Sequence, residues 1–165
     1  MSKFKDELRR SVLYFVKKMP WAYQDRIHYF RKFKRLPNIR EPKLFNEKVL
    51  YRKFVNGDYV RYSKLSDKFT VRDYIADVIG EEYLIPLVHE TSDPTTLLSL
   101  PSLKNTVVKP NHGSNMVKIL LEEPDSLQKQ LIVNRCHEWL RKDFSEEARE
   151  IHYRYIKPRI LVEQY

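Results

Sequence analysis

The N-terminal part of the chain alternates apolar and basic positions with the period of an α-helix. Between residues 3 and 19, apolar side chains recur every three or four positions, and Lys or Arg fills most of the remaining faces. The apolar positions are Phe4, Leu8, Val12, Phe15, Val16 and Met19. Pro20 and Pro37 interrupt the pattern, so the spacing predicts helices over 3–19 and 21–35. A third, shorter helix is expected to begin near Asn46.

From Ser66 onward the pattern changes to helices that alternate with short apolar strands. Gly80 stands where a helix C-terminus favours a positive φ angle, and Asp93 with Pro94 is typical of a helix start. The first expected elements are a helix from Asp67 to Gly80, a strand at 83–90 and a short helix ended by Pro101. Pro86 should place that strand near an edge or a bulge. Strands at 106–109 and 116–121, a helix at 126–142 and a strand at 159–165 are expected to follow. This order predicts a mixed α/β or α+β arrangement.

The helix expected at 126–142 also contains the single cysteine, Cys136. Five apolar residues are predicted on its core side: Leu127, Leu131, Ile132, Trp139 and Leu140. Cys136, His137 and His152 lack the paired short spacings of a zinc site. A cysteine beside a tryptophan inside a helix is more typical of a small core residue. We therefore assign no metal site to these residues.

Composition narrows the class of protein. The chain has 165 residues, of which 42% are hydrophobic, which suits one domain or a piece of a larger protein. A single cysteine cannot form an intrachain disulfide, and this favours a reducing compartment. No apolar run approaches the roughly 18 residues that a membrane helix needs, and the N-terminus lacks a signal-peptide pattern. We expect a cytoplasmic protein.

Charge is distributed unevenly along the chain. Residues 1–65 hold 18 Lys and Arg against 6 Asp and Glu, a balance of +12, whereas residues 66–165 have a balance of −3. The basic part, which is rich in aromatic residues, suits contact with an anionic membrane or with nucleic acid. It suits equally well a pair of surface helices that bury their aromatic stripes against the rest of the protein. The sequence leaves these interpretations open.

The clearest candidate for chemistry is the stretch TVVKPNHGSNMVKILL, at 106–121. Lys109 ends an apolar strand, and a small polar loop of Asn111, His112, Gly113 and Ser114 follows it. A lysine beside a flexible loop with free backbone N–H groups can hold a phosphate, but a plain β-hairpin with a glycine turn fits the stretch as well. The spacing matches neither the Walker A motif nor the dinucleotide fingerprint.

Four motifs, taken together, resemble a known family. They are LFNEK at 44–48, SDKFTVRDYIADVIGEEYLIPL at 66–87, VVKPNHGS at 107–114 and IKPRILVEQY at 156–165. In this order they are similar to the TupA-like branch of the ATP-grasp superfamily, over about Pro37 to Tyr165.

The resemblance implies roles for individual residues. Lys109 and the loop of Asn111, His112, Gly113 and Ser114 would contact the phosphates of ATP, with Lys68 as a second basic contact. Glu163, Gln164 and Tyr165 match the hinge strand that presents its backbone to the adenine edge. ATP is the expected cofactor. The ligands of the accompanying Mg²⁺ would lie beyond Tyr165, in a second subdomain.

The resemblance also implies an architecture. We expect an α/β (α+β) chain with a basic helical region at 1–42 and a partial ATP-grasp-like domain at 43–165. A mixed sheet flanked by helices should form that domain, and its second subdomain would be missing. A final strand with no successor is expected to leave an open sheet edge. This chain alone would then be an incomplete enzyme.

The function implied is a step in bacterial cell-surface polysaccharide or teichuronopeptide synthesis, where such proteins are found. We expect an ATP-dependent, ligase-like reaction in which an amine attacks an acyl phosphate. One alternative is a glycosyltransferase, the label that many members carry, although no Asp-x-Asp motif is present. Another is a non-enzymatic basic module. Expected partners are a nucleotide, a saccharide or amino-acid acceptor, and the inner membrane face through the basic N-terminus; no specific nucleic acid is expected.

Overall fold

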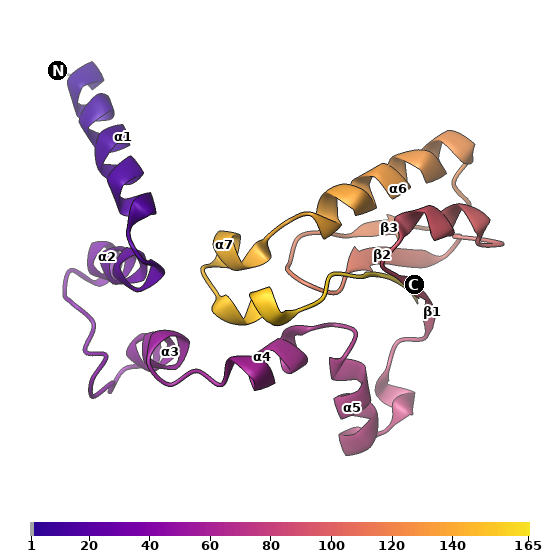
Figure 1. Cartoon of the computed structure of the whole chain (residues 1–165), viewed down its shortest axis with the longest axis horizontal. Helices are drawn as coiled ribbons and strands as arrows, with labels where there is room; N and C mark the ends of the chain where they lie inside the picture. The colour runs from indigo at the N-terminus through magenta and orange to yellow at the C-terminus, as the bar shows by residue number, and fades with distance from the viewer. Residues whose placement is uncertain (1) are drawn as a thin grey trace. The chain divides into compact units, whose positions relative to one another are not determined.

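A computed structural model describes residues 2–165, with backbone alone described for residues 2–6, 8, 9 and 12. The chain divides into two compact units, Met1–Gly57 and Asp58–Tyr165 (Figure 1).

The first unit is helical. It contains α1 (Ser2–Lys18), α2 (Trp21–Phe33) and α3 (Phe45–Phe54), which confirms the three helices predicted there. An ion pair of 2.7 Å between Lys53 Nζ and Asp25 Oδ2 joins α3 to α2. The buried Glu47 carboxylate accepts backbone N–H groups of Leu44, Lys43 and Asn38 at 3.1–3.2 Å, and the bond from Leu44 is the main reason that its pKa is lowered. These contacts fix the segment between α2 and α3.

The second unit is built on a four-stranded sheet with the order β1-β4-β2-β3. The strands are β1 (Leu87–Thr91), β2 (Thr106–Pro110), β3 (Lys118–Leu120) and β4 (Ile160–Gln164). The α/β class is confirmed, but every strand pair is antiparallel, so the expectation of a mixed sheet is wrong. The expected open edge at the last strand is also wrong. β4 lies inside the sheet, where both of its edges are paired, and β1 and β3 form the edges.

One face of the sheet carries the hydrophobic core. It is covered by α6 (Ser126–Leu140) and by the 3₁₀ helix η2 (Pro94–Ser99). Both start at an aspartate: Asp125 accepts the N–H of Gln128 at 2.8 Å, and Asp93 accepts that of Thr95 at 3.0 Å. The core consists of Leu97, Leu103, Val108, Met116, Leu120, Ile132, Val133, Cys136, Trp139, Phe144, Ile160 and Val162.

The buried face of α6 differs from the predicted one. Ile132 and Trp139 are buried as expected, but Leu127 is 70% and Leu131 59% exposed. Val133 and Cys136 take their place in the core, because the helix is rotated toward them. Burial raises the pKa of the Cys136 thiol to about 12, which agrees with its interpretation as a core residue.

The segment that leads to the sheet holds α4 (Tyr59–Ser66) and α5 (Val71–Ile79), and α4 was not predicted. Gly80 ends α5 with a φ of 110°, as expected, and the short 3₁₀ helix η1 (Glu81–Tyr83) follows. The strand predicted at 83–90 therefore begins only at Leu87, and its register shifts between Leu87 and His89 at the sheet edge. Neither α7 (Phe144–Ala148) nor η3 (Ile151–Tyr155) was predicted from the sequence.

Candidate functional site

The loop after β2 lies against the turn that precedes α5. The backbone N–H of Lys68 donates to the carbonyl oxygen of Asn111 at 3.0 Å. The Nζ atom of Lys68 donates to the carbonyl oxygen of Gly113 at 2.5 Å. The structure thus brings together Lys68 and the loop that follows Lys109, two segments that are distant in the sequence.

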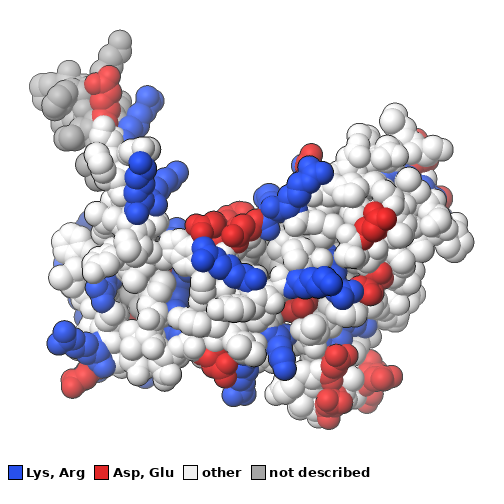
Figure 2. Space-filling model, viewed as in Figure 1, with Lys and Arg blue, Asp and Glu red and all other residues white. Residues whose placement is uncertain are grey.

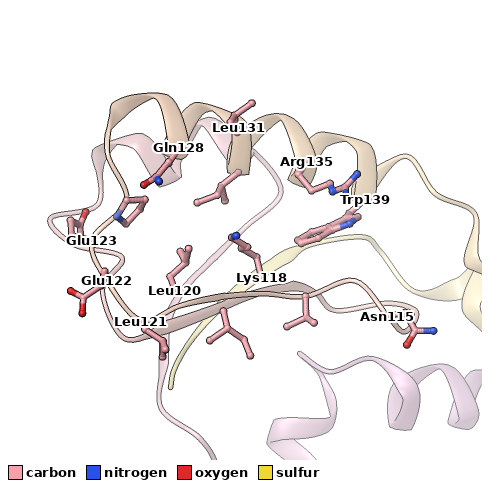
Figure 3. A pocket seen from close by; sticks show the side chains of 14 residues that line it. Asn115, Lys118, Leu120, Leu121, Glu122, Glu123, Gln128, Leu131, Arg135 and Trp139 are labelled. Carbon is pink, nitrogen blue, oxygen red and sulfur yellow. The ribbon is translucent and has the colours of Figure 1, made fainter.

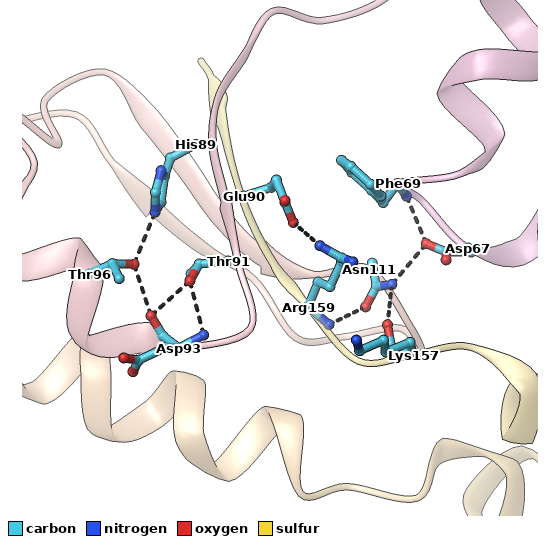
Figure 4. A network of polar contacts seen from close by, with 10 residues as sticks. All are labelled: Asp67, Phe69, His89, Glu90, Thr91, Asp93, Thr96, Asn111, Lys157 and Arg159. Carbon is cyan, nitrogen blue, oxygen red and sulfur yellow. Dashed lines mark hydrogen bonds and ion pairs between the residues drawn. The ribbon is translucent and has the colours of Figure 1, made fainter.

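Asn111 holds this junction together (Figure 4). Its side chain is fully buried; Nδ2 donates to Asp67 Oδ1 at 2.9 Å and to the carbonyl of Lys157 at 3.0 Å. Its Oδ1 accepts the backbone N–H of Arg159 at 2.7 Å. Both side-chain donors are engaged within the protein, so Asn111 positions the loop and the start of β4.

Lys109 and Glu163 form an ion pair on the sheet face opposite the core. They are diagonal neighbours across β2 and β4, because Val107 pairs with Glu163 and Lys109 with Leu161. Arg72 from α5 approaches the same carboxylate, with Nη1 3.6 Å from Oε1. Glu163 is only 5% exposed, so a buried acidic group holds two cationic side chains in place.

Positive charge exceeds negative charge in this cluster of Lys68, Arg72, Lys109 and Glu163, which we call the basic cluster. Burial lowers the pKa of Lys68, and the nearby charge of Lys109 lowers it further, whereas Asp67 and Glu163 act in the opposite direction. Two ammonium groups are thus close enough to repel each other. An anion bound between them would relieve this repulsion.

Gly113 is required by the shape of the loop. Its φ of 78° lies in the left-handed region, and a Cβ atom there would stand 2.6 Å from Met116 Cε and 2.7 Å from Phe144 Cδ2. Ser114 follows on the surface. No hydrogen bond of its hydroxyl is found among the described residues, so this group is available to a ligand.

His112 lies in the same loop, but its ring is turned into the protein. The residue is 3% exposed, and Nε2 has no hydrogen-bond partner among the residues that the structure describes. Its Nδ1 lies 3.4 Å from Asn111 Oδ1. Burial is the main cause that lowers the pKa of His112, so the neutral ring is favoured. The structure places His112 beneath the loop, on the side of the core.

Gln164 and Tyr165 continue from Glu163 at the end of β4. The N–H of Gln164 donates to the carbonyl of Pro86 at 3.0 Å, and that of Tyr165 to the carbonyl of Asn105 at 2.9 Å. Both side chains are exposed. Gln164 lies on the same strand as Glu163 and Tyr165 directly follows it, but no described contact joins them to the loop.

A protein-family model described as TupA-like ATPgrasp matches residues 47–165. The match covers most of the chain and includes every residue of the basic cluster and its loop. The chain belongs to this TupA-like ATP-grasp family. No curated protein and no solved structure gave a significant match. ATP-grasp proteins generally bind ATP together with Mg²⁺.

Sequence reasoning had missed two arginines of this TupA-like chain. Arg72 lies in the first turn of α5, and nothing in the spacing indicated its approach to Glu163. Arg159 pairs with Glu90 Oε2 at 2.6 Å, and its guanidinium carbon lies 5.1 Å from the centre of the Phe69 ring. Both arginines lie inside motifs on which the resemblance to the family rests, and this position could have marked them as candidate site residues.

Hollows occur at two places in the second unit, Asp58–Tyr165. An open one of about 460 Å³ adjoins the basic cluster and is lined by residues such as Phe69, Arg72, Pro86 and Leu87. Another of about 540 Å³ lies between β3 and α6, where Lys118 points toward the helix (Figure 3). β3 is the direct neighbour of β2, but α6 covers the core face of the sheet, whereas Lys109 and Glu163 lie on the opposite face. Within residues 2–165 as described, no group of three His, Cys, Asp or Glu side chains has the arrangement of a metal site.

Proposed function

We propose that the basic cluster and the loop 111–114 bind the phosphates of ATP. The observation that supports this most directly is the convergence of Lys68 and Lys109 beside the Gly113 loop. Two lysines that repel each other, one of them with a lowered pKa, suit a polyanion better than solvent. The hollow lined by Phe69, Arg72 and Leu87 is the candidate place for the nucleoside part.

The residues present fit such a ligand. Glu163 orients Lys109, and the Gly113 carbonyl orients Lys68, so both ammonium groups are held in place before a phosphate arrives. Charge that is fixed in advance stabilises a developing negative charge without further reorganisation. The Ser114 hydroxyl adds a directional donor. When bound with Mg²⁺, ATP would supply the phosphoryl group that activates a carboxylate.

In its biological setting we place the protein in bacterial cell-surface polysaccharide synthesis, in the cytoplasm, in an ATP-dependent, ligase-like reaction. An amine of a saccharide- or amino-acid-type acceptor would attack the carbonyl carbon of the acyl phosphate, so that an amide C–N bond forms, the C–O bond to phosphate breaks, and inorganic phosphate and a proton leave. Glycosyl transfer is the competing activity. It predicts that a sugar nucleotide competes with the ATP analogue for the cluster.

Replacing Lys109 tests this proposal. Lys109→Ala should weaken binding of a non-hydrolysable ATP analogue with Mg²⁺ by about 10- to 100-fold, the size expected for a charge-assisted hydrogen bond of about 1.5–3 kcal/mol. Isothermal titration calorimetry would measure both affinities, and circular dichroism would check that the variant is folded.

The matched control is Lys104→Ala. Lys104 is an exposed lysine just before β2 whose partner is Glu122, at 2.8 Å. Its replacement should leave the affinity unchanged. Equal affinities of the wild type and Lys109→Ala would remove Lys109 from phosphate binding, and displacement by a sugar nucleotide would favour glycosyl transfer.

A further inference from the structure

Helix α1 presents exposed apolar side chains. Among the α1 side chains that the structure describes, Val16 alone is partly buried and the others are exposed. Phe15 is 65% exposed, Tyr14 56% and Leu13 36%, and Met19 follows the helix at 41%. Large apolar side chains clustered on one exposed helix indicate a binding surface.

Apolar side chains are exposed on α2 and on the segment after it as well. Tyr23, Phe30, Phe33 and Leu36 are exposed there, Leu36 at 73%. Basic side chains stand among them: Lys18 Nζ lies 4.4 Å from the centre of the Tyr14 ring, and the guanidinium carbon of Arg26 lies 5.5 Å from that of Tyr23. Figure 2 shows basic side chains, with uncharged ones between them, over the described part of α1.

We infer that α1, with the exposed aromatic residues of α2, binds the surface of an anionic lipid bilayer. The argument is charge complementarity joined to apolar exposure. Residues 1–65 carry a balance of +12, and anionic lipids attract basic segments close to the surface. An amphipathic helix lies in the interface with its apolar side among the acyl chains, its aromatic rings at the headgroups and its lysines toward the phosphates.

A bilayer fits these side chains better than a nucleic acid does. Exposed aromatic rings can stack on bases, but the aliphatic side chains of Leu13, Met19 and Leu36 have no counterpart on a phosphate backbone. A bilayer buries both kinds. None of the described helices is long and apolar enough to cross a membrane, so the contact is with the surface.

Vesicle binding tests the inference. The full chain should bind vesicles of phosphatidylcholine mixed with phosphatidylserine, and bind vesicles of phosphatidylcholine alone much less. Trp21, at the start of α2, reports the contact through a blue shift of its fluorescence, while Trp139 is already buried in the core of the other unit. Phe15→Ser should weaken binding by about tenfold, because one large apolar side chain no longer enters the interface.

Phe45→Ser is the matched control. Phe45 is 78% exposed in the same unit but belongs to α3, so its replacement should leave vesicle binding unchanged. The inference is overturned if the protein ignores mixed vesicles, if Phe15→Ser binds as well as the wild type, or if the protein instead binds RNA or DNA through this surface. None of these results bears on ATP binding by Lys109, so the two proposals stand or fall separately.

Discussion

The loop between β2 and β3 divides its residues between the exposed surface and the core side. Ser114 is exposed, whereas His112, two positions earlier, is buried, and its Nε2 has no hydrogen-bond partner among the described residues. From the sequence both were equal candidates for phosphate contact. Which way each side chain turns depends on Phe144 and Met116, which close the space behind Gly113. Met116 is a near neighbour in the sequence, but the contact with Phe144 comes from a distant part of the chain and leaves no local pattern.

His112 makes the stability of the protein depend on pH. Its pKa is lowered in the folded state, so the unfolded chain binds the proton more readily. The contribution of His112 to the free energy of unfolding should therefore be fully present above the ordinary histidine pKa of 6.5. It should be lost as the pH falls from 6.5 toward the lower pKa that His112 has in the folded protein. Urea unfolding at a series of pH values would measure this loss.

The variant His112→Gln should lose part of this acid-induced decline, because glutamine does not titrate. His28→Gln is the control, since His28 is exposed on α2. An unchanged pH profile in His112→Gln would show that other groups cause the decline.

At the scale of elements, Asn111 connects three segments. It joins the end of β2, the start of β4 and the turn before α5 through hydrogen bonds to Arg159, Lys157 and Asp67. Lys68 rests on the same residue through its backbone. The position of the basic cluster relative to the loop therefore depends on a residue that contributes no charge.

The variant Asn111→Ala should lower the free energy of unfolding by about 3 kcal/mol, because it leaves buried partners such as the Arg159 N–H and Asp67 unsatisfied. Chemical denaturation of the purified variant would measure the change. Asn134→Ala, on the exposed side of α6, should change it by less than about 0.5 kcal/mol. A similar small effect at Asn111 would mean that water replaces these bonds.

Most helices and strands could be predicted because their apolar positions repeat with a clear period or because a proline, glycine or aspartate marks an end. Gly80 and Asp93 are such marks, and both predictions are confirmed. The strand order could not be predicted, since pairing depends on contacts between distant segments. The short α7, with five residues, is too brief to show a period.

At the scale of the whole molecule, positive charge occurs in two settings. Most of the described basic side chains of α1 and α2 are exposed, whereas in the basic cluster the Lys109 and Arg72 side chains are only 23% and 17% exposed. Salt screens exposed charges much more than partly buried ones. The two regions should therefore respond differently to ionic strength.

Added sodium chloride should weaken binding to phosphatidylserine-containing vesicles more steeply than binding of the ATP analogue at a constant Mg²⁺ concentration. Vesicle sedimentation and calorimetry on the same protein preparation would give the two slopes. Equal slopes would mean that the cluster holds its ligand through exposed charges alone.

The place of β4 between β1 and β2 has a consequence for how the protein is made. While the ribosome synthesises the chain, β1 and β2 emerge first but have no direct pairing with each other. β2 can pair with β3 soon after both emerge, but β1 has no strand partner until residues 160–164 have left the exit tunnel, which takes on the order of several seconds at ordinary rates of translation. During that interval β1 and one edge of β2 stay unpaired in the nascent chain, and chaperones that bind extended apolar segments have time to act on it.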